Sequence, residues 1–425
     1  MVELFPFQQR VLDQTEPFNR VAYYLDMGLG KTFVGAEKAV QLGTRVTLIV
    51  CQKSKISDWI KHFVEHYFNY SIYDLTDKRQ LQWFMEDKGL FPEKIGVINY
   101  DLIFRRKDFL KLENFTLVLD ESSQIQNDAA HIKRTNFILK MKPANVILLS
   151  GTPTSGKYEN LWSQIHLLGW EISKKVYNRQ YVNWKKIEVD GFPIRVVDKE
   201  NPYKNVERLK SKMREHGAVF IKTEEVFDLP EQTFVEVSVS KTKEYKRFQR
   251  SRIITVGGVE LIGDTPLTLR LYSRMLCGHL NPGKLAAFYD LCASTNDRLI
   301  VFYNFDAELE ALRQIAVELE RPVSEVNGHT KDLTNYEAED NSITLVQYQA
   351  GAMGLNLQKA NKIIYFTPTD KSELFEQSKK RIHRIGQDRP CFYYLLVCQD
   401  SVEDEEIFPM LGLRKELTDD LFKEN

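Results

Sequence analysis

Leu25-Asp26-Met27-Gly28-Leu29-Gly30-Lys31-Thr32 is the stretch of sequence that most directly indicates the fold. The β-branched and aromatic run at 21–24 predicts a strand before it, and the apolar spacing over 33–42 predicts a helix after it. A strand that leads through a glycine loop into a helix can surround an anion, because the loop N–H groups turn toward it and the helix N-terminus is partly positive. The stretch therefore predicts a phosphate-binding loop.

Five residues of this loop are candidates for binding ATP. Gly28, Leu29 and Gly30 would place backbone N–H groups around the phosphates. Lys31 would reach the β- and γ-phosphates, and the Thr32 hydroxyl would ligate Mg²⁺. The first glycine of the general pattern G-x-x-x-x-G-K-[ST] is absent, so the loop alone leaves a nucleotide site and a coincidental glycine turn both open.

Composition limits the class of protein. A chain of 425 residues is too long for one ordinary core, so we expect two or three domains. The net charge of −1 excludes a generally basic nucleic-acid coat but leaves room for a local basic groove. Five cysteines without a C-x-x-C pair favour neither a disulfide framework nor a zinc site. With no signal-peptide pattern and no apolar run of about 18 residues, we expect an intracellular protein without a membrane partner.

Short apolar runs recur along the chain in two sets, one within 21–150 and one within 299–397. Because these runs are continuous rather than alternating, they predict strands buried on both faces, as in parallel sheets covered by helices. In such sheets ligands lie beyond the carboxyl ends of the strands, so the polar residues after each run are the candidates for a site. The runs after the first strand are 46–50, 117–119, 146–149, 299–303, 344–348, 363–366 and 393–397.

Two adjacent carboxylates, Asp120 and Glu121, follow the run at 117–119. In a nucleotide site Asp120 would hold Mg²⁺, and Glu121 would orient and deprotonate the attacking water. The alternative is an acidic helix N-terminus, which is common. The glycine loop upstream favours the hydrolytic interpretation.

Three further polar segments follow other runs. Residues 150–153 form a Ser-Gly-Thr-Pro turn, and 349–356 are rich in glycine. In 377–387, Arg381 and Arg384 are three residues apart, so on a helix they would share one face and could point at one anion. Arginines that reach the γ-phosphate from a second domain are typical of NTPases, whereas a solvated charged helix is the alternative.

Together these motifs resemble those of the Swi/Snf-like family of helicase superfamily 2, whose members are double-stranded-DNA translocases. Residues 25–32 are similar to the family's D-E-M-G-L-G-K-T, and 150–153 to its S-G-T-P. Residues 350–357 resemble A-G-G-x-G-L-N-L, and 377–387 resemble the diagnostic Q-A-x-x-R-x-H-R-I-G-Q. The resemblance covers nearly the whole chain, and we expect a compact, catalytic-core member like those of phages or bacteria.

Other segments agree with the family or depart from it. Residues 283–285 are similar to its S-G-K-L entry to the second lobe, and 402–407 to its closing T-V-E-E-x-I. Ser123 stands where histidine is usual, which removes a group that helps couple nucleotide and DNA states. Residues 367–369 lack the usual Asp-Trp-Asn run, so contacts there cannot be carried over.

The resemblance implies an α/β fold of two RecA-like lobes with parallel sheets, plus inserted helical protrusions and small β-hairpins. We expect lobe 1 over 1–230, with a protrusion at 155–230. Lobe 2 would span 231–425, with a helical protrusion at about 241–282 and an acidic tail at 400–425.

The family's motif positions also imply site residues. Arg381 and Arg384 would be catalytic, with ATP bound between the lobes. Gln8 would read the adenine, Gly354 would approach the nucleotide or backbone, and Gln377 would lie beside the γ-phosphate.

The same positions imply DNA contacts at Ser54, Thr152 and Gly351, made to phosphates. Residues 171–222 contain thirteen lysines and arginines against seven acidic residues, so they are a second candidate for phosphate contacts or else a solvated helical surface.

Turn residues predict two β-hairpins. The first spans 185–197 with Asp190-Gly191 at its turn, and the second spans 253–262 with Gly257-Gly258. A hairpin at a duplex junction can separate strands, but more often such an insertion only decorates a lobe.

We therefore expect an ATP- and Mg²⁺-dependent translocase on double-stranded DNA that remodels DNA, including branched DNA or protein–DNA complexes. We expect a cytoplasmic monomer, associated with the nucleoid if the source is a prokaryote or a phage, and the sequence leaves a recruiting protein partner open. The alternatives are a strand-separating DNA or RNA helicase and a catalytically inactive DNA-binding scaffold. The intact set Lys31, Thr32, Asp120, Glu121, Arg381 and Arg384 argues against the scaffold.

Overall fold

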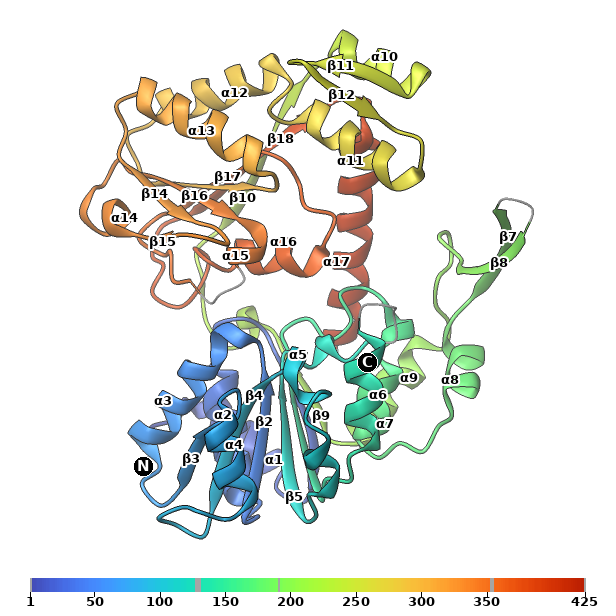
Figure 1. The fold of residues 1–425 in the computed structure, drawn as a ribbon, viewed down its shortest axis with the longest axis vertical. Helices are drawn as coiled ribbons and strands as arrows, with labels where there is room; N and C mark the ends of the chain where they lie inside the picture. Colours follow the sequence, from blue (N-terminus) through green and yellow to red (C-terminus); the bar gives the residue numbers. More distant parts are fainter. Residues whose placement is uncertain (1, 127–130, 190–191, 352–354, 424–425) are drawn as a thin grey trace. The chain divides into compact units, whose positions relative to one another are not determined.

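A computed structural model describes residues 2–126, 131–189, 192–351 and 355–423 (Figure 1). The chain divides into two compact units. Unit 1 is Met1–Val226 with Leu417–Asn425, and unit 2 is Phe227–Glu416. Each unit is built on a seven-stranded sheet with helices, so the predicted α/β fold with two mainly parallel sheets is confirmed. Within the described ranges, no helix is long and apolar enough to cross a membrane.

The sheet of unit 1 has the order β3-β4-β2-β5-β6-β1-β9, and all of its pairings are parallel. The predicted runs are confirmed as β1, β2, β5 and β6 in the middle of the sheet. The strands are β1 Arg20–Leu25, β2 Val46–Cys51, β3 Ser71–Asp74, β4 Lys94–Asn99, β5 Phe115–Asp120, β6 Asn145–Leu149 and β9 Ala218–Ile221. The helices are α1 Pro6–Gln14, α2 Lys31–Gln41, α3 Ile56–His66, α4 Lys78–Met85, α5 Tyr100–Ile103, α6 Ile132–Lys140, α7 Trp162–Leu167, α8 Lys174–Tyr181 and α9 Val206–Glu215.

The sheet of unit 2 has the order β10-β18-β17-β13-β16-β14-β15, and only the short β15 at its edge runs antiparallel. The four runs predicted there are confirmed as β13, β16, β17 and β18. The strands are β10 Gln232–Val239, β13 Leu299–Tyr303, β14 Val323–Val326, β15 Lys331–Asp332, β16 Ile343–Gln347, β17 Lys362–Tyr365 and β18 Cys391–Cys398. The helices are α10 Lys243–Ser251, α11 Pro266–Cys277, α12 Pro282–Ala293, α13 Asp306–Glu318, α14 Thr334–Ala338, α15 Tyr348–Gly351 and α16 Ser372–Lys379. Helix α17 (Phe408–Phe422) begins in unit 2, and its residues from Leu417 onward belong to unit 1.

Burial explains why these strands are apolar at every position. In β13, Ile300 and Phe302 belong to one buried cluster, while Leu299, Val301 and Tyr303 belong to another. Successive side chains of a strand point to opposite faces, so both faces of this sheet are covered. Burial of each such side chain contributes about 1.5–3 kcal/mol.

Both predicted hairpins form. Strands β7 (Trp184–Val189) and β8 (Phe192–Val197) pair antiparallel and project from unit 1 beyond α8 (Figure 1). Strands β11 (Ile253–Val256) and β12 (Val259–Ile262) pair in unit 2. Gly257 and Gly258 have φ of 57° and 80°, the left-handed backbone that a two-residue hairpin turn requires. The turn residues Asp190 and Gly191 lie outside the described residues.

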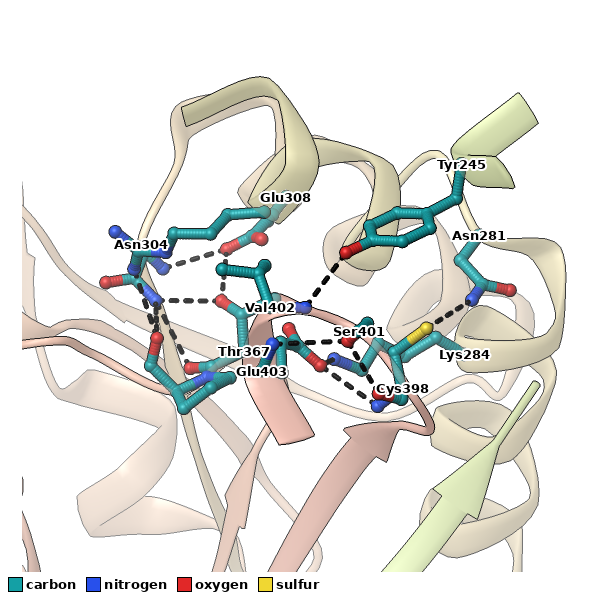
Figure 2. Close-up of polar contacts among 12 residues, drawn as sticks. Tyr245, Asn281, Lys284, Asn304, Glu308, Thr367, Cys398, Ser401, Val402 and Glu403 are labelled. Carbon is teal, nitrogen blue, oxygen red and sulfur yellow. Dashed lines mark hydrogen bonds and ion pairs between the residues drawn. The ribbon is translucent and has the colours of Figure 1, made fainter. Parts of the chain in front are cut away.

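A buried ion pair joins two distant segments of unit 2 (Figure 2). Lys284 Nζ lies 2.6 Å from Glu403 Oε2, and the two side chains are 0% and 1% exposed. The same carboxylate oxygen accepts a hydrogen bond from Cys398 N at 3.0 Å. The segments 283–285 and 402–407, both noted for their family resemblance, are therefore in contact, and this contact fastens α12 to the end of β18.

A second buried carboxylate organises the turn after β13 (Figure 2). Glu308 Oε2 accepts from Asn304 N (2.8 Å), Phe305 N (3.1 Å) and the Thr367 hydroxyl (3.0 Å). Burial raises the pKa of Glu308 to about 7, although these hydrogen bonds oppose the rise. Thr367, one of the departures from the family pattern, therefore has a structural partner.

Lys284→Met should leave Glu403 buried without its cation. We expect a loss of about 3–5 kcal/mol in the free energy of unfolding, because an uncompensated buried charge is costly. Urea denaturation of the full chain measures it. The double variant Lys284→Met/Glu403→Leu removes both charges and should lose less than the single variant. A single variant as stable as the wild type would contradict a structural role for the pair.

Candidate nucleotide site and arginine segment

The topology of unit 1 brings three predicted polar segments to one edge of its sheet. Strands β5, β6 and β1 are neighbours and run parallel, so their carboxyl ends lie side by side. The glycine loop follows β1, the two carboxylates lie at the end of β5, and the 150–153 turn follows β6. This is the edge at which parallel sheets bind ligands.

The glycine loop has the backbone that its sequence predicts. Gly28 and Gly30 have φ of 86° and 70°, and a Cβ added to Gly30 would lie 2.4 Å from Gln8 Nε2. The N-cap of α2 is Gly30, which has no side chain to cap the helix. A helix N-terminus without a side-chain cap can direct its N–H groups to an anion such as a phosphate.

Lys31 lies folded over the loop. Its Nζ donates to Leu25 O at 3.0 Å and to Asp26 O at 3.3 Å. Gly151 is packed close by, since a Cβ there would lie 3.3 Å from the same Nζ. A phosphate would offer this ammonium charge-assisted hydrogen bonds in place of two neutral carbonyls.

The two carboxylates differ in environment. Asp120 is 9% exposed, and its Oδ2 accepts a 2.9 Å hydrogen bond from Trp59 Nε1. Burial raises the pKa of Asp120, while the Trp59 hydrogen bond and the Lys31 charge act against that rise. Glu121 has a φ of 55°, a left-handed conformation that costs a non-glycine residue about 1–2 kcal/mol. Its Oε2 accepts from Ser150 Oγ at 3.4 Å, so Glu121 is turned toward the 150–153 segment.

These residues suit a magnesium nucleotide. Asp120 supplies a carboxylate and Thr32 a hydroxyl at the start of α2, both hard oxygen ligands of the kind Mg²⁺ prefers. Lys31 supplies the cation and the glycine loop the backbone donors for phosphates.

Gln8 supports the loop from α1. Its side chain is 2% exposed, accepts from Phe5 N at 2.9 Å and donates to Leu29 O at 3.0 Å. Because Gln8 lies close to Gly30, it is beside the glycine loop. Recognition of adenine by Gln8 stays a prediction.

Gln164 on α7 is a site residue that sequence reasoning missed. Its Oε1 accepts from Tyr24 (3.0 Å) and Ser122 (2.8 Å), and its Nε2 donates to Pro153 O at 2.7 Å. One buried amide therefore joins β1, the carboxylate segment and the 150–153 turn. The available signal was the segment directly before it, 160–163, which resembles the N-L-x-E-L-W-S of the Swi/Snf-like family.

The three predicted DNA contacts lie in different environments. Ser54 is exposed in the short 3₁₀ helix Lys53–Lys55. Thr152 is 5% exposed, and its hydroxyl has no hydrogen-bond partner among the described residues. Gly351 is buried, and a Cβ there would lie 2.9 Å from the Phe302 ring. Contact with DNA stays a prediction for all three.

In unit 2 the segment with both arginines does not continue as a helix, because α16 ends at Lys379. Arg381 and Arg384 lie in the turns that follow. Gly386, with φ of 91°, and the Gln387 side chain shape this segment. The Gln387 amide donates to the carbonyl oxygens of Gln358 (3.0 Å), Ala360 (2.9 Å) and Ile382 (3.2 Å).

The predicted catalytic residues of unit 2 are partly buried. Arg381 donates to Leu355 O at 3.4 Å, and burial lowers the pKa of Arg384. Gln377 is 5% exposed and donates to Glu373 Oε1 at 3.3 Å, while its own Oε1 is buried with no hydrogen-bond partner in the described segments. Gly354 lies outside the described residues.

Two family models match the chain. The SNF2-related domain matches residues 25–279, and the helicase conserved C-terminal domain matches 283–386. The first match takes in the glycine loop and both carboxylates, and the second takes in both arginines.

Curated relatives are similar at low identity. The SWI/SNF-related matrix-associated actin-dependent regulator of chromatin subfamily A member 1 of Mus musculus is 22% identical over 89% of this chain. The subfamily A-like protein 1 of Drosophila melanogaster is 22% identical over 98% of it. The chain spans only 39% and 55% of the lengths of these relatives.

Among solved structures, the Sulfolobus solfataricus SWI2/SNF2 ATPase core in complex with dsDNA aligns over 99% of this chain and 93% of that chain. The identity is 19% and the TM-score is 0.46.

Trp59→Phe should raise the pKa of Asp120, because it removes the indole N–H that favours the ionised carboxylate. We expect the loss of Mg²⁺-dependent nucleotide binding on acidification to move to higher pH. Binding of a fluorescent nucleotide across a pH series measures the midpoint. Trp162→Phe is the matched control, since that indole donates to Ile172 O instead. An unchanged midpoint in Trp59→Phe would remove Asp120 from the metal site.

Proposed function

The chain belongs to the SNF2-related family, and we propose that it is a DNA-dependent ATPase that uses hydrolysis to move along double-stranded DNA and remodel it. The observation that carries the ATPase proposal is the meeting of Lys31, Asp120 and Glu121 at one edge of the unit 1 sheet. Family membership adds the second domain, with its two arginines.

In the proposed site, the glycine loop and the start of α2 bind the phosphates of ATP. Lys31 exchanges the carbonyls of Leu25 and Asp26 for the β- and γ-phosphates. Thr32 and Asp120 would hold Mg²⁺, which when bound offsets the negative charge of the phosphates.

Glu121 is proposed to orient the attacking water and to take up its proton. Its backbone is already placed in a strained conformation beside Ser150, as expected of a residue held for chemistry. The Tyr100 hydroxyl donates to Asp120 O at 2.9 Å, which holds the end of β5 in place.

Arg381 and Arg384 are proposed to stabilise the charge that develops on the γ-phosphate, with Gln377 beside it. Burial lowers the pKa of Arg384 because the guanidinium cation is not fully hydrated. An anionic ligand would compensate for the missing hydration. Gly354 is proposed to let its segment approach the nucleotide or the DNA backbone closely.

The DNA part of the proposal draws support from the relatives, two of which are named as regulators of chromatin. Ser54, Thr152 and Gly351 are the proposed phosphate contacts, which would tolerate any sequence during movement. We propose a monomer with two sets of DNA contacts, which ATP binding and hydrolysis change in turn.

Glu121→Gln should bind ATP as the wild type does but hydrolyse it at least about 100-fold more slowly, because general-base catalysis contributes about that much or more. Lys31→Ala should instead weaken ATP binding. Glu65→Gln, an exposed carboxylate change in the same unit, is the control. Wild-type turnover in Glu121→Gln would show that the water is activated elsewhere.

Translocation can be separated from strand separation with a DNA triplex. We expect ATP to drive release of a third strand bound along a duplex, while the two strands of that duplex stay paired. Glu121→Gln should release none. Separation of the duplex strands themselves would favour the strand-separating helicase over the translocase.

A further inference from the structure

A basic cavity lies at the root of the β7–β8 hairpin and away from the glycine loop in sequence. It has a volume of about 940 Å³ and is lined by α8, by both hairpin strands and by the segment that returns from the hairpin. Its charged and aromatic lining residues are Lys175, Arg179, Trp184, Arg195, Asp198 and Lys204.

The cavity gathers cations that have no counter-ion. None of its four basic side chains forms an ion pair with any carboxylate in the described ranges, and each is exposed. The single acid, Asp198, accepts a hydrogen bond from Glu200 N at 3.1 Å. By contrast, neighbouring α9 pairs Lys210 with Glu207 at 3.0 Å and Lys212 with Glu215 at 2.5 Å. In a chain whose net charge is −1, a concave surface with four uncompensated cations is a site for a polyanion.

An aromatic side chain adds a second kind of contact. Trp184 is half-buried at the start of β7, and the Arg195 guanidinium lies 5.5 Å from its ring centroid. Lys186 and Arg195 are cross-strand partners on the same face as Trp184. A basic groove beside an aromatic ring is the combination by which proteins hold unpaired nucleic-acid strands, through phosphate contacts and base stacking.

The cavity is firmly built at its root. Asn183 donates from its backbone to Pro202 O and from its side chain to Asn201 O, both at 2.9 Å. Tyr203 stacks on Tyr158 with ring centroids 4.4 Å apart, and its hydroxyl donates to Glu159 at 2.6 Å. Little ordering of the protein is therefore needed when a ligand binds.

We propose that this cavity binds an unpaired strand of DNA, with phosphates at Lys175, Arg179 and Lys204 and a base or sugar against Trp184 and Arg195. A concave site of this volume is on the scale of a few bound groups rather than a duplex surface. The proposed function left the preferred DNA structure open. The cavity would select DNA that carries a single-stranded branch or tail, and only the choice of DNA as the polyanion rests on the proposed function.

Fluorescence anisotropy without nucleotide tests the site, so a failure of ATP hydrolysis would not affect the result. We expect the wild type to bind a duplex with a single-stranded oligo(dT) tail at least about 10-fold more tightly than the blunt duplex. Lys175→Ala/Arg179→Ala/Lys204→Ala should lose that preference and bind the two alike. For this variant, the slope of log affinity for the tailed DNA against log salt concentration should become shallower by about two. The reason is that three phosphate contacts to a single strand contribute about 0.7 each.

The matched control is Lys61→Ala/Lys88→Ala/Lys111→Ala, which removes the same charge from exposed, ion-paired positions of unit 1 and should keep the preference. Trp184→Ala tests the stacking contact separately and should weaken binding of the tailed DNA alone. Thermal unfolding of each variant verifies its fold. Equal loss of tailed-DNA binding in the control triple would overturn the proposal. A second result would also overturn it: the wild type binds a poly-glutamate peptide but shows no preference for tailed DNA, and the cavity triple variant loses binding of the peptide. That result would assign the cavity to an acidic protein.

Discussion

The parallel pairing of β5, β6 and β1 is the constraint on which the candidate site depends. It brings the glycine loop, the carboxylates and the 150–153 turn to one edge, although residues 33–119 separate the loop from the carboxylates and residues 122–149 separate the carboxylates from the turn. Lys31 is then bonded to the carbonyls at the end of β1, and Asp120 is buried at the end of β5. Reversal of any one of these strands would carry its polar segment to the opposite edge.

Local strain and burial penalties gather at that same edge. Gly28 and Gly30 take left-handed backbone, Glu121 does so without being glycine, and Asp120 has a raised pKa. The buried amide of Gln164 holds three of the converging segments in place. Residues that break local rules while their surroundings hold them in place are expected where a protein performs chemistry.

Unit 2 shows that motif residues can serve architecture rather than chemistry. Lys284 and Glu403 belong to segments that the family resemblance singles out, and they form a fully buried ion pair (Figure 2). Gln387 ends the most diagnostic segment, and its amide is used to fold the turn that carries Arg384. A motif match alone does not separate these roles, whereas hydrogen-bond partners do.

Sequence patterns predicted the central strands of both sheets because burial on both faces leaves continuous apolar runs. They missed β10, whose side chains alternate in exposure at the edge of its sheet, and the short β3, β9, β14 and β15. They also missed β4, although all six of its residues are buried. No sequence pattern indicated where α16 ends, because the turn beyond it depends on carbonyls of residues 358–360, which are distant in sequence. Gln164 and the basic cavity depend in the same way on tertiary neighbours, although the basic excess of 171–222 was visible.

Steady-state ATP hydrolysis tests whether the chain is a motor driven by duplex DNA. It is measured with no nucleic acid, with blunt duplex DNA, with single-stranded DNA and with RNA. Duplex DNA should raise turnover at least about 10-fold, which corresponds to a barrier lower by about 1.4 kcal/mol. Stimulation by single strands or RNA but not by duplex, or no hydrolysis under any condition, would contradict it.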